Sequence, residues 1–88
     1  MTINIKDLKN KIIYRANYRG SKEMDKLLGS FTKKYIDQFN ELELKLLCDL
    51  LDFDDENLYR FNQDQNLTIQ IKLNKVSEMF KNYKYVSD

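Results

Sequence analysis

The chain has 88 residues, of which 42% are hydrophobic and 33% charged, and its formal net charge is +1. This size and composition predict one globular domain near the lower size limit for independent folding. No apolar run approaches the about 18 residues that a membrane span needs, so we expect no membrane insertion.

The missing residue types narrow the possible chemistry. The sequence has no histidine and one cysteine, so it lacks the commonest acid–base catalyst and cannot form a thiolate metal cluster or an internal disulfide. Cys48 lies among leucines, which favours a buried, inert thiol over a nucleophile. We therefore expect neither enzyme activity nor a metal site.

Charge is distributed unevenly along the chain. Residues 1–40 carry nine lysines and arginines against four acids, residues 41–66 carry two against eight, and residues 67–88 carry four against two. A basic end and an acidic middle favour recognition of a protein partner, and we expect the free chain to be monomeric. The start of the chain matches neither a secretory signal nor a transit peptide, so the bacterial cytoplasm is the expected location.

The first predicted element is an amphipathic helix over about residues 5–17. Its apolar residues recur at helical spacing, namely Ile5, Leu8, Ile12, Ile13 and Ala16. Tyr14, Arg15 and Tyr18 flank this stripe. Such side chains can stack on the flat rings of a nucleotide or cofactor, but we favour the interpretation that they cover the edge of a core.

A turn is predicted at Arg19-Gly20. Both glycines of this proline-free chain lie between Tyr18 and Gly29, and Gly20 separates two helical patterns, where a positive φ is typically needed. Glu23 then falls in the first turn of the next helix, where the positive helix end favours a carboxylate. We expect Arg19 and Glu23 to be exposed, either as a recognition surface or as an ordinary i,i+4 surface pair.

The helix after this turn has one apolar face, made of Met24, Leu27, Leu28, Phe31, Tyr35 and Ile36. Gly29-Ser30 interrupts the face. This interruption leaves open one kinked helix or two short helices, the second capped by Ser30.

A capping pattern at Asn40-Glu41-Leu42-Glu43 predicts the start of the following helix. Its expected apolar stripe is Leu42, Leu46, Leu47, Leu50 and Leu51. Asp54 or Asp55 is expected to cap a further short helix.

The tail permits two interpretations. Leu67, Ile69, Ile71 and Leu73 alternate as in a strand, whereas Ile69, Leu73, Val76, Phe80 and Tyr83 fit a helix. Because one isolated strand would have nothing to pair with, we predict a helix over about residues 68–82. The expected fold is all-α, a compact single-domain bundle of about five helices over residues 1–88, with Leu27, Leu46, Leu47 and Leu50 buried.

Two segments carry a family pattern. Residues 18–31 contain an RGxxE motif, from Arg19 to Glu23, followed by Met-Asp and a leucine pair. Residues 50–59 contain a leucine pair, an acidic loop and Asn-Leu-Tyr. Together and in register, they resemble the small assembly factors of the succinate dehydrogenase flavoprotein, which are the bacterial flavinylation factor and the mitochondrial assembly factor 2. The resemblance covers about residues 8–62.

The resemblance implies a function in cofactor attachment. Such factors are small helical proteins that bind the flavoprotein subunit of succinate dehydrogenase or fumarate reductase and promote covalent attachment of FAD to a histidine of that client. FAD then belongs to the client, and this chain would carry no covalent flavin. By resemblance, the client-binding surface includes Arg19, Gly20 and Glu23 with Asp25 beside them, and we extend it to Arg15 and Tyr14.

The chain also departs from the family pattern. Ser21 stands where the family usually has a bulky apolar residue, and the tail after Asn62 shows no useful match. A competing hypothesis is a helical nucleic-acid-binding or regulatory module. Its phosphate-contacting stripe would be Lys6, Lys9, Lys11, Arg15 and Arg19. The acidic middle of the chain counts against nucleic-acid binding.

Overall fold

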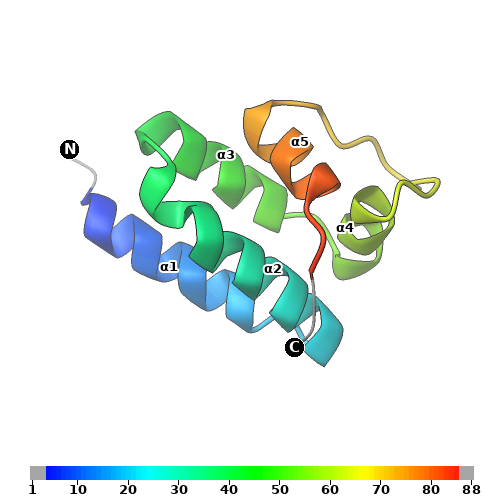
Figure 1. Cartoon of the computed structure of the whole chain (residues 1–88), viewed down its shortest axis with the longest axis horizontal. Helices are drawn as coiled ribbons and strands as arrows, with labels where there is room; N and C mark the ends of the chain where they lie inside the picture. Colours follow the sequence, from blue (N-terminus) through cyan, green and yellow to red (C-terminus); the bar gives the residue numbers. More distant parts are fainter. Residues whose placement is uncertain (1–3, 86–88) are drawn as a thin grey trace.

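The computed structural model describes residues 4–85 and shows a bundle of helices (Figure 1). The elements in chain order are α1 (Ile5–Asn17), α2 (Lys22–Tyr35), the 3-10 turn η1 (Ile36–Gln38), α3 (Glu41–Leu51), α4 (Asp55–Asn62) and α5 (Lys75–Asn82). The described residues contain no strand, and the predicted all-α bundle of five helices is confirmed. Within the same range, no helix is both long enough and apolar enough to cross a membrane.

A side chain at the preceding residue caps every α-helix. The five caps are Asn4, Ser21, Asn40, Asp54 and Asn74. Each oxygen accepts a hydrogen bond from a backbone N–H in the first turn, a group that has no partner within the helix. The predicted capping box at Asn40 is present in full, and Asp54 rather than Asp55 caps α4.

Helices α1 and α2 lie side by side along the molecule (Figure 1). They approach closely at Gly29, where a Cβ atom would lie 2.3 Å from Asn17 Oδ1. The glycine therefore allows close packing of the two helices and does not interrupt α2. The alternative of two short helices is wrong, because Ser30 lies inside α2 and its hydroxyl donates to the Leu27 carbonyl at 3.1 Å.

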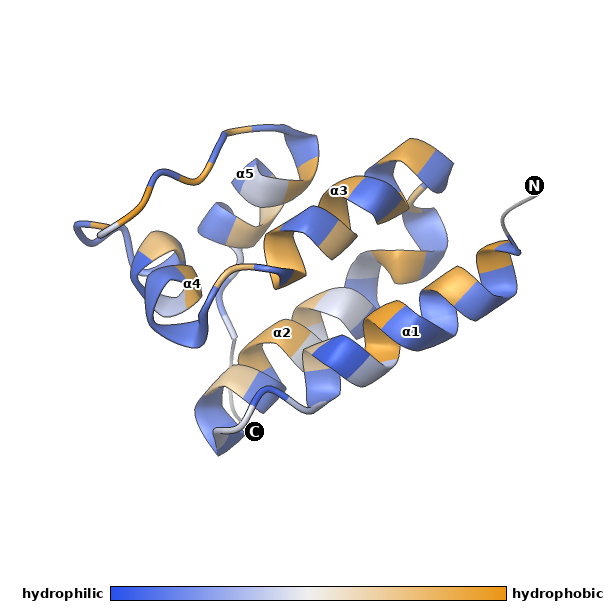
Figure 2. Cartoon of the chain, turned by 180° about the vertical axis from the view of Figure 1, so that it is seen from behind, coloured by the Kyte–Doolittle hydropathy of each residue, from blue (hydrophilic) through white to orange (hydrophobic). Residues whose placement is uncertain are grey.

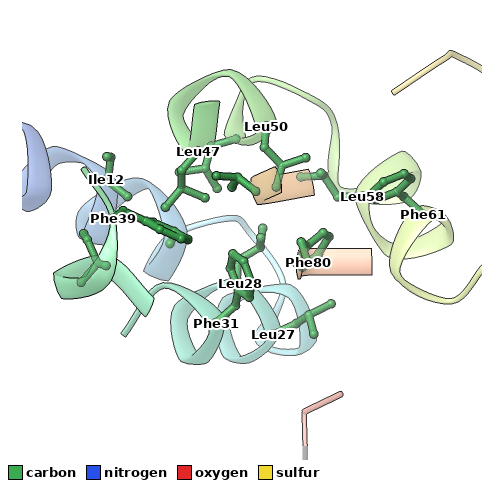
Figure 3. Close-up of a cluster of buried hydrophobic side chains, with 14 of the residues drawn as sticks. Ile12, Leu27, Leu28, Phe31, Phe39, Leu47, Leu50, Leu58, Phe61 and Phe80 are labelled. Atoms are coloured by element: carbon green, nitrogen blue, oxygen red, sulfur yellow. The ribbon is translucent and has the colours of Figure 1, made fainter. Parts of the chain in front are cut away.

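Helix α3 supplies the centre of the hydrophobic core. In Figure 3 its Leu47 and Leu50 lie across from Leu28 and Phe31 of α2. The buried hydrophobic residues are Ile12, Ala16, Met24, Leu27, Leu28, Phe31, Ile36, Phe39, Leu44, Leu47, Leu50, Leu51, Leu58, Phe61, Ile71, Val76 and Phe80. All five helices contribute to this one cluster.

The predicted leucine stripe of α3 is partly wrong. Leu42 is 67% exposed and Leu46 is only half-buried, whereas Leu44 is fully buried. Residues 44, 47 and 51 follow the spacing of three and four that defines one helix face, and residue 42 points away from that face. Figure 2 shows the resulting mixture of hydrophobic and hydrophilic positions along the helix.

The predicted helix over residues 68–82 is correct only in its second half. Residues 67–74 have no regular structure, and α5 begins after the Asn74 cap. Thr68 is held by the buried Asn57 of α4, whose side-chain oxygen accepts from the Thr68 backbone N–H at 3.1 Å. This contact gives the backbone a tertiary partner in place of an intrahelical one.

The strand-like alternation does not describe this segment either, because residues 69, 71 and 73 would share one face of a strand. Ile71 is buried, while Ile69 and Leu73 are 42% and 54% exposed. The irregular segment needs no paired strand, because Ile71 inserts into the core and side chains from neighbouring elements bind the backbone of Thr68 and Lys72.

Two polar contacts hold α5 against the bundle. Lys75 Nζ lies 2.6 Å from Glu43 Oε2 on α3. On the other side, the buried Asn62 amide of α4 donates to the carbonyls of Phe80 and Tyr83, both at 2.8 Å. The two hydrogen bonds from Asn62 satisfy carbonyls at the C-terminal end of α5, a helix of only eight residues.

One buried and one exposed leucine of α3 provide a direct test of the core. Leu47→Asp is expected to unfold the domain, since an unpaired buried carboxylate costs several kcal/mol against a total stability of about 5–15 kcal/mol. Leu42→Asp is the matched control and should melt within about 0.5 kcal/mol of wild type. Thermal unfolding followed by circular dichroism measures both, and equal melting of the two variants would contradict this core.

The contact between Glu43 and Lys75 predicts a dependence of stability on pH. Hydrogen bonds from Lys75 and from the Asn40 backbone lower the pKa of the Glu43 carboxyl below its ordinary value of 4.5. Because the folded pKa is the lower one, the carboxylate stabilises the fold above pH 4.5, and this contribution is lost as the pH falls through the folded pKa. Lys75→Met should raise the pKa of Glu43 and reduce the stability that is lost on acidification. Lys72→Met should change neither quantity. Unchanged NMR titration of Glu43 in Lys75→Met would refute the contact.

Candidate functional site

The predicted turn between the first two helices is present. Helix α1 ends at Asn17 and α2 begins at Lys22, and Gly20 between them has a φ of +110°. This left-handed conformation is unfavourable for residues with a Cβ, so the glycine is required by the backbone. Ser21 caps α2 by accepting from the Met24 N–H at 3.2 Å, which gives this departure from the family pattern a structural role.

Arg19 faces inward, and the prediction that it is exposed is wrong. Its side chain is 12% exposed. The guanidinium donates from Nε to Asp55 Oδ1 at 2.9 Å, and from Nη1 and Nη2 to the carbonyls of Leu51 and Phe53, both at 2.7 Å. These acceptors lie at the end of α3, in the following loop and at the start of α4, so one side chain joins three parts of the chain.

The i,i+4 pair with Glu23 is therefore not the contact that Arg19 makes. Among the described residues its ionic partner is Asp55. The guanidinium reaches the carbonyl end of α3, which carries partial negative charge and unpaired carbonyls. A planar group with several fixed N–H donors suits three acceptors at once.

Asp25 also serves the fold. It is half-buried in the first turn of α2, and its Oδ1 accepts a hydrogen bond from the backbone N–H of Arg19. The carboxylate thus fixes the turn from the inside, at the positive end of α2. Glu23, two residues earlier on the same helix, is exposed.

Arg15 makes a second, more exposed contact with the same region. Its Nη2 pairs with Asp52 Oδ1, and its Nη1 donates to the Cys48 carbonyl at 3.4 Å. The Arg15 side chain is 38% exposed and that of Asp52 is 68% exposed. Arg15 of α1 and Arg19 of the turn therefore both meet the end of α3, but only Arg19 is enclosed.

The acidic loop after α3 is ordered by its own hydrogen bonds. Asn57 donates from its side chain to Asp54 Oδ1 at 2.7 Å and from its backbone to Asp54 Oδ2 at 3.3 Å. These bonds hold the pKa of the Asp54 carboxyl below its ordinary value. The loop caps α4 through Asp54 and accepts hydrogen bonds from Arg19, including one to Asp55. These contacts give its acidic residues a structural role.

Cys48 does not provide a reactive group. The thiol is half-buried and packs against the core, and burial raises its pKa, which favours the unreactive protonated form. Over residues 4–85, no three acid or thiol side chains gather in a way that could hold a metal ion.

The corner, by which we mean the turn at residues 18–21 with the adjoining ends of α1 and α2, presents an exposed aromatic pair. Tyr14 and Tyr18 are 66% and 70% exposed, and their ring centroids are 4.7 Å apart. The expectation that they cover the edge of the core is wrong. Tyr18 was not among the predicted site residues, although its spacing of four from Tyr14 indicated that the two share a face.

Glu23 lines a separate hollow of about 480 Å³ between α2, α4 and the tail. The side chains around it include Lys26, Tyr59, Gln63 and Tyr85. No sequence pattern indicated this set, because its members come from parts of the chain that only the tertiary structure brings together.

The predicted site residues thus divide into two groups. One group makes intramolecular contacts and consists of Arg19, Asp25 and, in part, Arg15. The other group is exposed and consists of Tyr14, Gly20 and Glu23. A Cβ at Gly20 would meet no atom within 4 Å, so the turn is open to close approach by another molecule.

Intramolecular ion pairs also interrupt the basic stripe that the nucleic-acid hypothesis requires. Arg19 is enclosed, Arg15 pairs with Asp52, and Lys9 pairs with Asp37 at 3.2 Å. The stripe therefore does not present a continuous row of free cations to phosphate groups.

Substitution of the two arginines tests this division. Arg19→Ala should destabilise the fold by about 2–4 kcal/mol, because it leaves Asp55 and two carbonyls without their donor. Arg15→Ala should cost under about 1 kcal/mol, as expected for a solvent-exposed pair. Arg19→Lys should fall between them, since a single ammonium cannot reach all three acceptors in the same geometry. Urea denaturation measures the three variants, and equal loss in Arg19→Ala and Arg15→Ala would show that Arg19 is not the central contact.

Comparison with known proteins supports the family indicated by the two sequence segments. A family model described as the flavinator of succinate dehydrogenase matches residues 10–84, so the match includes the tail that showed no resemblance by inspection. Over 49 residues the chain is 43% identical to the mitochondrial succinate dehydrogenase assembly factor 2 of Scheffersomyces stipitis. The aligned part covers 56% of this chain and 33% of that relative, so the chain spans about one third of the relative's length. No solved structure matches the chain.

With most of its length matched and both motif segments in contact, the chain belongs to the family of flavinators of succinate dehydrogenase.

Proposed function

We propose that this chain is an assembly factor that binds the flavoprotein subunit of succinate dehydrogenase, or of fumarate reductase, and promotes covalent attachment of FAD to that subunit. The observation that carries the proposal is membership of the flavinator family over residues 10–84. The name of the relative from S. stipitis, an assembly factor for succinate dehydrogenase, supports the same client.

The exposed part of the corner has the features of a docking surface. Tyr14 and Tyr18 offer large amphipathic side chains of the kind enriched at the centres of interfaces. Gly20 allows the client backbone to approach closely, and the exposed Glu23 offers a charge that the client can pair when both are desolvated. These four residues form the proposed client-binding surface.

Arg19, Asp25 and Arg15 have a supporting role in this proposal. By joining the corner to the end of α3 and the start of α4, they hold the four exposed residues in a fixed arrangement. A rigid surface loses little conformational freedom on binding, so more of the interaction energy is available to order the client.

The contribution of the factor is geometric. Docking would restrict a client loop or domain so that the flavin and the client histidine face one another, and well-oriented groups react far faster than freely diffusing ones. The bond-forming chemistry belongs to the cofactor and the client. The chain itself is proposed to carry no covalent flavin and to turn over no substrate alone.

Deletion of the gene tests the function. Cells without the chain should contain flavoprotein subunit with much less covalent FAD, measured as flavin fluorescence of the denatured subunit on a gel. The wild-type chain should restore the fluorescence and Glu23→Ala should restore it poorly, since loss of one charged partner costs about 2–5 kcal/mol, or at least about thirtyfold in affinity.

The controls for this experiment separate binding from folding. Glu23→Ala should melt as wild type does, because its carboxylate is exposed. Glu78→Ala removes an exposed carboxylate from the first turn of α5, outside the corner, and should restore fluorescence fully. Undiminished fluorescence in the deletion strain, at equal subunit levels, would overturn the proposed function.

A further inference from the structure

A groove of about 660 Å³ lies between α1 and α2, and its lining includes none of the four residues of the client-binding surface. Its apolar lining comes from Ile5, Ile13 and Ile36. Ile5 and Ile13 belong to the predicted apolar stripe of the first helix, and they are 36% and 39% exposed. The groove therefore keeps aliphatic surface in contact with water, which costs free energy that a partner can recover.

The groove is also basic. Its lining includes Lys6, Lys9 and Lys33, and the one acid that lines it is Asp37. Asp37 is paired with Lys9, Nζ to Oδ1 at 3.2 Å. The remaining lysines are exposed, and cations beside an apolar wall attract anionic groups more strongly than cations surrounded by water.

The groove continues toward the corner. A second hollow of about 340 Å³ shares Asn17, Gly29 and Lys33 with it and adds Lys26 and Asp25. Asp25 is the residue that accepts the Arg19 backbone N–H. Gly29, where α1 and α2 approach closely, lines both hollows, so the groove leads from the exposed isoleucines to the edge of the corner.

We propose that this groove seats an acidic, amphipathic segment of the client flavoprotein. Aliphatic side chains of the segment would contact Ile5 and Ile13, and its aspartates or glutamates would face Lys6 and Lys33. Exposed aliphatic surface, an excess of cations and continuity with the corner occur together in this groove and favour such an occupant. Because the client is assigned by the proposed function, this inference rests on that proposal.

Photo-crosslinking identifies the occupant directly. Benzoylphenylalanine is placed at position 13, in the groove, or at position 42, an exposed site on α3 outside it. Each chain is mixed with purified flavoprotein subunit of succinate dehydrogenase and irradiated. Position 13 should crosslink to a client peptide with more acidic than basic residues, at least tenfold more efficiently than position 42. Crosslinks mainly to a second copy of the chain, or equal yields at the two positions, would overturn the inference.

Charge reversal provides an independent measurement. Lys6→Glu and Lys33→Glu should each weaken binding to the purified subunit at least fivefold at low salt, and the wild-type affinity should fall with salt more steeply than that of either variant. Lys45→Glu, an exposed lysine on α3 outside the groove, is the matched control and should bind as wild type does.

The outcomes separate the two proposals. If Glu23→Ala loses binding while both groove variants bind as wild type does, the groove inference fails and the assembly function stands. If the wild-type chain does not bind the subunit at all, the proposed client fails, and the groove inference fails with it.

Discussion

The Arg19 guanidinium is the contact on which the rest of the molecule depends. It lies at the turn between the first two helices and binds the Leu51 and Phe53 carbonyls and the Asp55 carboxylate. An enclosed cation is tolerated only when its donors are satisfied, and here the acceptors are the otherwise unpaired end of α3 and the first turn of α4. The two segments that carry the family pattern are far apart in sequence and form one structural unit through this side chain.

This contact separates the roles within one short motif. Arg19 and Asp25 face inward and fix the turn, so Gly20 can keep its positive φ and Glu23 stays exposed. Loss of function after substitution in the motif therefore has two distinct physical origins, unfolding of the corner or loss of a surface contact. A stability measurement distinguishes them.

The uneven charge of the sequence is largely used inside the fold. Arg15 and Arg19 from the basic part pair with Asp52 and Asp55 from the acidic part, and Lys75 pairs with Glu43. The acidic middle was interpreted as a surface for a partner, but much of it binds the chain itself. Lys6 and Lys33, which line the groove between α1 and α2, are among the lysines that remain exposed.

Local chemistry in the sequence determined the caps, the position of the turn at Gly20 and the number of helices, because each depends on residues within one or two turns. The two motif segments of the sequence also indicated the correct family. The tertiary structure alone decided that Arg19 faces inward, because its acceptors lie more than thirty residues away along the chain. It likewise left residues 67–74 without regular structure, since Asn57 offers Thr68 a partner that no local pattern reveals. Periodicity shows which residues share a face, but only packing decides which face meets the core, which is why Leu42 and Ile13 are exposed.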